Sequence, residues 1–251
     1  MTQLPASFLT RPIAHRGFHN LAAGVPENSI AAFEAAIEAG YGIELDVQRS
    51  IDNEAMVFHD YDLDRLTGQT GPVAQCRAEA LGTIPLIGGT GTIPTLAQVL
   101  DLVAGRVPLL IEIKDQDGAL GPSIGPLEQA VADALRTYIG DAGVMSFNPH
   151  SIAKMAELLP DMARGLVTCD FDKDDWGTVP AATLDRLRDI PDFAATGSGF
   201  VSHDHTDLTR ARVQELKALG ANILCWTVRS PEQEADARKT AHNITFEGYT
   251  P

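Results

Sequence analysis

Cysteine is scarce in this sequence, which contains only Cys76, Cys169 and Cys225. The three are widely spaced and form no Cys-x-x-Cys pair, so the chain lacks the pattern of a disulfide framework and that of a thiolate metal site. We therefore expect three unpaired, buried, apolar cysteines in a protein of a reducing compartment.

Positive charge is also in short supply. The 19 lysines and arginines are outnumbered by 34 aspartates and glutamates, which gives a formal net charge of -15 at pH 7. Binding to phosphate backbones and to anionic lipid surfaces depends on clustered Lys and Arg. We therefore expect no nucleic-acid partner, and an anionic substrate would need a local cation.

Long apolar runs are absent as well. No stretch approaches the roughly 18 apolar residues that a membrane-spanning helix needs. Residues 1–10 lack the basic and apolar regions of a secretion signal. With 44% hydrophobic and 21% charged residues, the composition is typical of a globular protein with a sizeable core. We expect a cytoplasmic protein without a membrane span.

Short apolar strands alternate with helical patterns from residue 12 to residue 247. Eight strands joined by helices are typical of an α/β fold of the (β/α)8 TIM barrel type, for which 251 residues is a usual length. We predict one domain over 1–251, with a turn-rich insertion at about 61–94 that covers the site. The expected strands are 12–15, 42–47, 107–114, 143–147, 163–168, 199–202, 222–228 and 243–247, and the expected helices are 27–40, 95–104, 126–138, 149–159, 182–187, 208–219 and 231–240.

Residues 55–59 form an additional strand that does not fit the alternation. Only the turn-like segment 51–54 separates them from the preceding strand, whereas a parallel neighbour would need a crossover of a dozen or more residues. The segment must therefore fold back as a hairpin, which places His59 beside Glu44 and Asp46.

Polar side chains gather at the carboxyl ends of the predicted strands, where barrel active sites lie. Glu44 and Asp46 are two residues apart and point to the same face of a strand, and the same holds for Glu112 and Lys114. His15 ends the first strand. Three carboxylates at one place would repel one another, and a cation would relieve that repulsion. Oxygen-only ligands favour Mg²⁺ or Ca²⁺ over Zn²⁺.

Each of these residues has a simpler interpretation when taken alone. Carboxylates at strand ends are often merely solvated, and an isolated histidine such as His59 is often packed or solvated. Five polar groups at equivalent ends of separate strands would, however, cost burial energy without compensation unless they act together. Their conjunction therefore favours a metal-assisted acid/base site.

The remaining histidines are weaker candidates. His203 and His205 either reach the barrel mouth or belong to a polar loop. His19 and His150 are expected in a loop or at a helix start, and His242 at a helix end, where its charge would favour the helix dipole.

An ordered set of motifs resembles the glycerophosphodiester phosphodiesterase family, within the superfamily of barrel-shaped phospholipase-C-like phosphodiesterases. The resemblance covers nearly the full length of the chain. It rests on His15-Arg16-Gly17, Pro26-Glu27-Asn28-Ser29, Glu44-Leu45-Asp46-Val47, Phe58-His59-Asp60, Leu63-Asp64-Arg65, Ile93-Pro94-Thr95-Leu96, Ile111-Glu112-Ile113-Lys114 and Trp226-Thr227-Val228.

This resemblance implies metal-dependent hydrolysis of glycerophosphodiesters to glycerol 3-phosphate and an alcohol, with one divalent cation as cofactor. The implied site residues are the acid/base pair His15 and His59, the metal ligands Glu44, Asp46 and Glu112, the phosphate contacts Arg16 and Lys114, the further polar residue Glu27, and Trp226 as an aromatic wall beside the alcohol or as plain core packing. Imidazole suits both proton transfers because its pKa lies near 6.5. The last strand reads Ile244-Thr245-Phe246-Glu247-Gly248-Tyr249, where many relatives carry an Asp-containing ending, so it predicts no substrate preference.

Three alternatives remain open from the sequence. The same machinery would also suit lysophospholipase D-like hydrolysis of lysophospholipid head groups. A Schiff-base lyase using Lys114 is less favoured, because neighbouring carboxylates would keep the amine protonated. A non-catalytic barrel that binds phosphate esters is the third.

Overall fold

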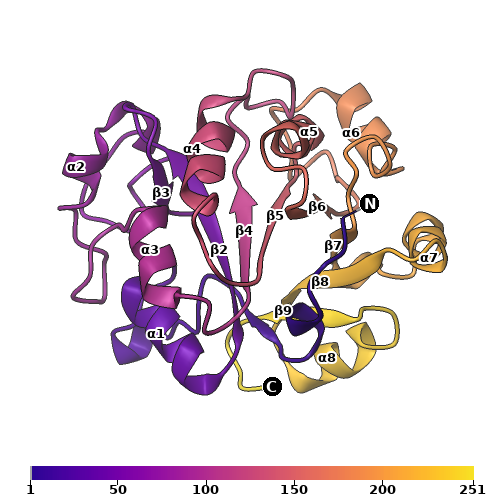
Figure 1. Cartoon of the computed structure of the whole chain (residues 1–251), viewed down its shortest axis with the longest axis horizontal. Helices are drawn as coiled ribbons and strands as arrows, with labels where there is room; N and C mark the ends of the chain where they lie inside the picture. The colour runs from indigo at the N-terminus through magenta and orange to yellow at the C-terminus, as the bar shows by residue number, and fades with distance from the viewer. Residues whose placement is uncertain (1) are drawn as a thin grey trace.

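The computed structural model describes residues 2–251, in which eight parallel strands close into a barrel (Figure 1). Closure occurs at the first strand, which pairs with both the second and the last. The parallel strands are β1 (Ile13–Ala14), β2 (Gly42–Arg49), β4 (Leu109–Ile113), β5 (Ala142–Ser146), β6 (Ala163–Thr168), β7 (Phe200–Asp204), β8 (Asn222–Val228) and β9 (Asn243–Phe246). The predicted (β/α)8 TIM barrel is confirmed.

Helices connect the strands and cover the outside of the barrel (Figure 1). Their starts follow the local capping chemistry. Ser29 Oγ accepts a hydrogen bond from the Ala32 amide, and Thr95 and Gln98 form a capping box. The helices are α1 (Ile30–Ala39), α3 (Leu96–Val103), α4 (Pro126–Leu135), α5 (Pro149–Leu158), α6 (Ala181–Leu187), α7 (Ala211–Ala218) and α8 (Pro231–Ala237).

Two expected helix starts need correction. The first helix starts at Ile30 and not at residue 27, because Asn28 has a left-handed φ of 52° that interrupts a helix. The helix expected at 208–219 starts at Ala211, because the 3₁₀ turn η4 (His205–Asp207) comes first and the side chain of Asp204 caps it.

The expected hairpin is present. Strand β3 (Ala55–Val57) pairs antiparallel with β2, so that Val57 lies opposite Val47. His59 lies two residues after β3, and the Phe58 amide donates to the Asp46 carbonyl at 3.0 Å, so the segment returns to the end of β2 as the short connection predicts.

Strand β2 shows how alternation fills the barrel. Leu45 and Val47 belong to the large apolar cluster between the sheet and the helices, so Glu44 and Asp46 point into the barrel. The parallel register then sets Asp46 opposite Glu112 of β4. Inward-pointing carboxylates from two neighbouring strands thus reach one level of the barrel.

The amino-terminal segment closes the opposite end of the barrel. Phe8, in the 3₁₀ turn η1 (Ala6–Leu9), is fully buried with Leu4 among the inward-facing apolar side chains. Asn243 Nδ2 of β9 donates hydrogen bonds to the Phe8 and Arg11 carbonyls, each at 2.6 Å. The segment therefore acts as a plug of the barrel.

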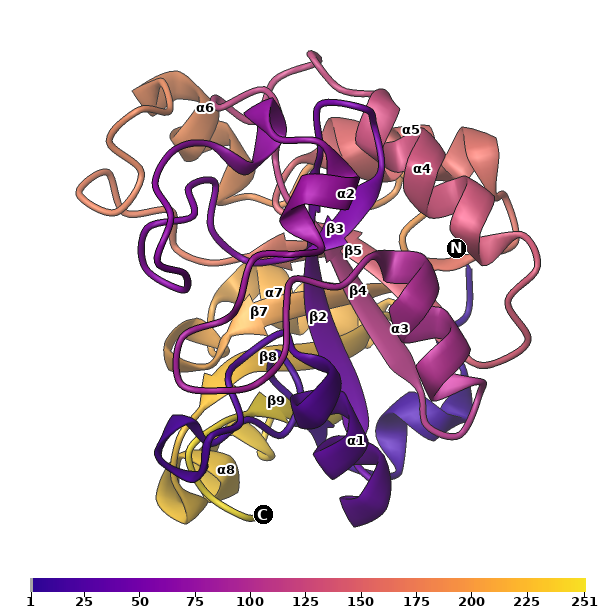
Figure 2. The ribbon, with the colours of Figure 1, turned by 90° about the vertical axis from the view of Figure 1, so that its left-hand side faces the viewer.

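The insertion contains no long element, as expected. It holds the 3₁₀ turn η3 (Val73–Gln75) and one four-residue helix, α2 (Ala78–Leu81), and packs its own apolar cluster around Phe58 (Figure 2). The Ile51 amide donates a hydrogen bond to the Cys76 carbonyl at 2.8 Å, which ties the insertion to the hairpin turn.

All three cysteines are free, but only Cys169 and Cys225 are buried. Cys76 is half-buried, contrary to expectation, because it ends the short η3 turn within the insertion. Within residues 2–251, no helix is both long and apolar enough to cross a membrane.

Replacing Phe8 by alanine tests the plug. We expect the free energy of unfolding to fall by about 3–5 kcal/mol, the usual cost of deleting a buried aromatic ring. Chemical denaturation measures it, with Leu21→Ala as the control because Leu21 is 59% exposed. A loss below about 1 kcal/mol for Phe8→Ala would contradict the assignment.

Candidate functional site

Side chains at the carboxyl ends of the strands converge on one cavity of about 170 Å³, here called the barrel cavity. Its wall includes every site residue predicted from sequence except Glu27. The lining residues are His15, Arg16, Glu44, Asp46, His59, Glu112, Lys114, Met145, Phe147, Trp226, Thr227, Arg229 and Thr245.

Three carboxylates meet in this cavity. One oxygen each of Glu44, Asp46 and Glu112 lies within 4.8 Å of the others, and all three side chains are buried. Lys114 Nζ lies 2.8 Å from Asp46 Oδ1 and 2.7 Å from Glu112 Oε1. Asn28 Nδ2 donates a hydrogen bond to Asp46 Oδ2 at 2.9 Å. An oxygen-only donor set of this kind fits a hard divalent cation such as Mg²⁺ or Ca²⁺.

The pKa values of Glu44 and Asp46 shift in opposite directions. Burial, and next the negative charges of Asp46 and Glu112, raise the pKa of Glu44 well above its usual range. Burial acts in the same direction on Asp46, but the positive charges of Lys114 and next of His59, Arg16 and His15 together outweigh it and lower the pKa of that carboxyl. Glu44 is therefore the acid on which the unrelieved repulsion falls.

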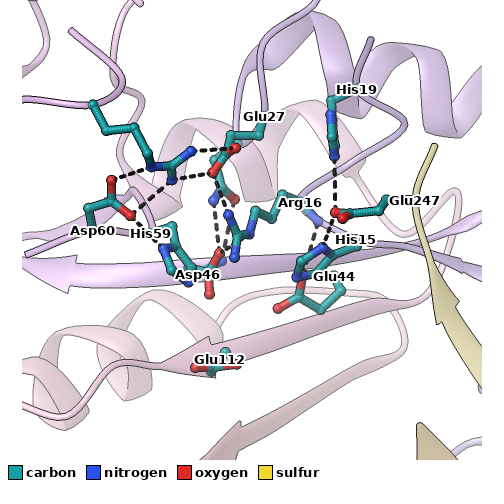
Figure 3. Close-up of polar contacts among 12 residues, drawn as sticks. His15, Arg16, His19, Glu27, Glu44, Asp46, His59, Asp60, Glu112 and Glu247 are labelled. Carbon is teal, nitrogen blue, oxygen red and sulfur yellow. Dashed lines mark hydrogen bonds and ion pairs between the residues drawn. The ribbon is translucent and has the colours of Figure 1, made fainter. Parts of the chain in front are cut away.

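Arg16 borders the acids through both its backbone and its side chain (Figure 3). Its amide donates to Glu44 Oε2 at 3.0 Å, its Nη1 donates to Glu27 Oε1 at 2.6 Å, and its Nε lies 3.4 Å from Asp46 Oδ2. The turn needs glycine next: Gly17 has φ 79°, and a Cβ there would lie 2.9 Å from the Ala32 carbonyl carbon. Arg16 thus lies between Glu27 and the metal-ligand candidates.

Both predicted histidines pair with a carboxylate through the same ring nitrogen (Figure 3). His15 Nδ1 lies 2.6 Å from Glu247 Oε2, and His59 Nδ1 lies 2.6 Å from Asp60 Oδ1. Each carboxylate favours the tautomer with its proton on Nδ1, which leaves the lone pair of Nε2 for the cavity. Burial lowers the pKa of His15, although the hydrogen bond to Glu247 opposes that shift.

An arginine connects the His59 pair to Arg16. Arg65 Nε donates to Asp60 Oδ2 at 2.7 Å, and its Nη1 and Nη2 donate to Glu27 at 3.0 and 2.8 Å. Hydrogen bonds from His59 and Arg65 lower the pKa of Asp60, against the effect of its burial. Glu27 therefore bridges two arginines rather than lining the cavity.

Glu247 is the contact that sequence reasoning missed most clearly. Besides His15 it accepts a hydrogen bond from Arg229 Nε at 2.7 Å, and His19 Nε2 lies 3.5 Å away. Strand alternation could have indicated its position. Glu247 lies two residues beyond Thr245, which lines the cavity, and such residues point to the same side of a strand.

The other histidines lie outside the cavity wall of the described residues. His203 is fully buried, with Nδ1 2.7 Å from Thr168 Oγ1 and Nε2 3.3 Å from Asp207 Oδ2. It shares the outward face of β7 with Val201, so it neither reaches the mouth nor lies in a polar loop. His205 belongs to η4, and His242 Nδ1 accepts from the Ile223 amide at 2.9 Å.

Trp226 lies at the boundary between the cavity and the apolar packing around it. It lines the barrel cavity, and its ring packs on Phe147 at a centroid distance of 5.6 Å. Its Nε1 donates to the Ser202 carbonyl at 3.0 Å, which fixes the indole.

The family model and the named relatives agree on one family. The model of the glycerophosphoryl diester phosphodiesterase family matches residues 15–245. The protein YhdW of Bacillus subtilis, provisionally named a glycerophosphodiester phosphodiesterase, is 30% identical over 89% of this chain and 88% of its own length. A glycerophosphodiester phosphodiesterase of Caldanaerobacter subterraneus is 35% identical over 63% of this chain and 66% of its own.

Solved structures share the fold. A phosphodiesterase of Oleispira antarctica, described in complex with the product sn-glycerol-3-phosphate, superposes with a TM-score of 0.77 at 23% identity, over 96% of this chain and 94% of that one.

Replacing Glu44 by glutamine separates the stability of the site from its function. Because the folded state raises the pKa of Glu44, it holds a proton more tightly than the unfolded chain. The stability of the metal-free protein should therefore fall as the pH rises above the ordinary pKa of about 4.5. In chelator at neutral pH, we expect Glu44→Gln to raise Tm by roughly 2–4 °C and to weaken metal binding. An unchanged or lower Tm would argue against electrostatic repulsion between Glu44 and the neighbouring carboxylates in the metal-free protein.

Proposed function

The chain belongs to the glycerophosphoryl diester phosphodiesterase family, and we propose that it hydrolyses glycerophosphodiesters to glycerol 3-phosphate and an alcohol with one divalent cation and two histidines. The observation that carries the proposal is the barrel cavity. There, two imidazoles that are each held by a carboxylate line the same cavity as three buried acids, one lysine and two arginines. The substrate is a small molecule, and residues 1–251 act as one catalytic domain with the insertion packed on it.

Glu44, Asp46 and Glu112 would hold the cation, Mg²⁺ or Ca²⁺. One oxygen from each of the three lies within 4.8 Å of the others. Burial and the negative charges of Asp46 and Glu112 raise the pKa of Glu44. When bound, the cation would offset the charge that develops on the phosphoryl oxygens.

The two histidines carry the proton transfers. In the first step one Nε2 accepts the proton of the attacking hydroxyl, the new P–O bond forms, and the other imidazole protonates the departing alkoxide as its P–O bond breaks. The resemblance to the family implies that the attacking group is the neighbouring glycerol hydroxyl, which gives a cyclic phosphate. Water then opens the ring with the histidine roles reversed.

Arg16 and Lys114 are the proposed phosphate contacts. Within residues 2–251 the buried Nε of Arg16 makes no hydrogen bond, although it forms an ion pair with Asp46 at 3.4 Å, and it is our proposed donor to a phosphoryl oxygen. Glu27 acts on the phosphate through Arg16, because it holds Arg16 Nη1 at 2.6 Å. Trp226 would form the wall next to the substrate.

A Schiff-base mechanism is opposed by the state of Lys114. The charges of Asp46 and Glu112 raise the pKa of its ammonium above the usual value despite burial. A protonated amine is not a nucleophile.

A cytoplasmic location stays a prediction, which fractionation of the source cells checks.

Both histidines are testable by deletion of the imidazole. His15→Ala and His59→Ala should each lower turnover of glycerophosphocholine by about 10²- to 10⁴-fold, the usual worth of general acid/base catalysis. Steady-state assays with and without chelator measure this, and chelator should abolish the wild-type rate. Turnover within threefold of wild type in both variants would reject the assignment.

Glu247→Gln tests the carboxylate behind His15. Loss of the negative charge should lower kcat/KM by about tenfold to a thousandfold, less than the loss of a whole catalytic group. Glu247 raises the pKa of His15, so the limb of the pH–rate profile governed by His15 should move to lower pH.

Glu234→Gln is the matched control, because Glu234 is as exposed as Glu247, at 19% for both side chains, and bonds Tyr249 and Arg238 instead. A profile of Glu247→Gln that keeps both limbs at their wild-type pH would show that Glu247 does not act through His15.

A further inference from the structure

A second and larger cavity opens beside the barrel cavity. It measures about 890 Å³ and is here called the side groove. It shares His59, Glu112, Lys114 and Phe147 with the barrel cavity, so the two lie next to each other. Its walls come from the start of the insertion, the segment after β4 and the segment before α6, which stand at the same end of the molecule (Figure 2).

Aromatic rings line the path from one cavity to the other. The centroids of Trp226 and Phe147 are 5.6 Å apart, and those of Phe147 and Trp176 are 5.0 Å apart, both edge to face. Trp226 lines the barrel cavity, Phe147 lines both, and Trp176 lines the side groove. The wall therefore continues outward from the place of the reacting phosphate.

The floor beneath these rings is apolar. Leu120 and Val179 line the side groove and are buried in one cluster with Phe171. Phe171 in turn packs on Trp176 at a centroid distance of 5.3 Å. Because other buried side chains support Leu120 and Val179, we expect the side groove to keep its shape without a ligand.

The size of the side groove limits what it is built for. Pockets for drug-sized ligands measure about 300–1,000 Å³, and the side groove falls in that range. A small head group such as ethanolamine or choline would leave most of it empty. The exposed acids Asp62, Asp64 and Asp175 on its rim also disfavour an anionic occupant.

We propose that the side groove binds the leaving alcohol of the substrate, and that this alcohol carries a bulky apolar group without negative charge. This inference rests on the proposed function, because it needs the phosphate in the barrel cavity. Trp176 and Tyr61 are then specificity-determining residues, one from the segment before α6 and one from the insertion.

A series of glycerophospho-n-alkanols with ethyl, butyl, hexyl and octyl leaving groups tests this with the whole chain and its divalent metal. Each fully buried methylene improves binding by up to about fourfold. Since the side groove is partly open, we expect kcat/KM of the octyl ester to exceed that of the ethyl ester by about a hundredfold. Concentrations stay below those at which the octyl ester aggregates.

Trp176→Ala should lower this octyl-to-ethyl ratio by about tenfold. Tyr61→Ala should lower it by about threefold, and it is a safe second variant because Tyr61 is 54% exposed. Each ratio is taken within one preparation, so partial unfolding does not alter it. Ile139→Ala, which removes an apolar side chain 90% exposed and remote from the side groove, should leave the ratio unchanged.

The outcomes separate two failures. A wild-type ratio below about threefold, or an equal ratio in wild type and both groove variants, overturns the inference while the proposed function stands. Absence of hydrolysis of every ester, with metal present, overturns the proposed function and the inference with it.

Discussion

The convergence of three buried carboxylates on one level of the barrel is the constraint on which the rest of the site depends. Strand alternation turns Glu44 and Asp46 inward, and the parallel register brings Glu112 beside them. Such a cluster costs free energy unless positive charge balances it. Lys114 and Arg16 supply part of that charge from the protein itself. The remainder, expressed in the raised pKa of Glu44, is what a divalent cation would relieve.

Around this cluster a second set of acids holds the two histidines that we propose as proton carriers. Glu247 and Asp60 fix His15 and His59 by the same ring nitrogen, although Glu247 is distant from its histidine in the sequence and Asp60 is adjacent to its own. Arg65 links Asp60 to Glu27, and Glu27 holds Arg16. Arg16, the proposed phosphate contact, and the imidazole of His59 therefore belong to one hydrogen-bonded network, so each helps to position the other.

Local rules predicted most of this arrangement. Period-2 alternation placed Glu44 and Asp46, and the four-residue turn before β3 required the hairpin that returns His59. The pairing of His15 with Glu247 spans 232 positions and exists only because β9 closes the barrel against β1, so no local pattern contains it. His203 was expected at the barrel mouth or in a polar loop. Its side chain instead points outward from the barrel, where Nδ1 contacts Thr168 Oγ1. Side-chain partners of arginines such as Arg65 depend on loop conformation, which the sequence does not specify.

Calorimetric titration of metal-free protein with Mg²⁺ and with Ca²⁺ tests the central claim most directly, since it measures the cation at the three acids without any substrate. The account predicts one binding site per chain in the wild type and none in Asp46→Asn. It also predicts proton release on binding, because the raised pKa lets Glu44 keep its proton to a higher pH than an ordinary glutamate does. Equal binding by wild type and variant, or no binding of either ion by the wild type, would contradict it.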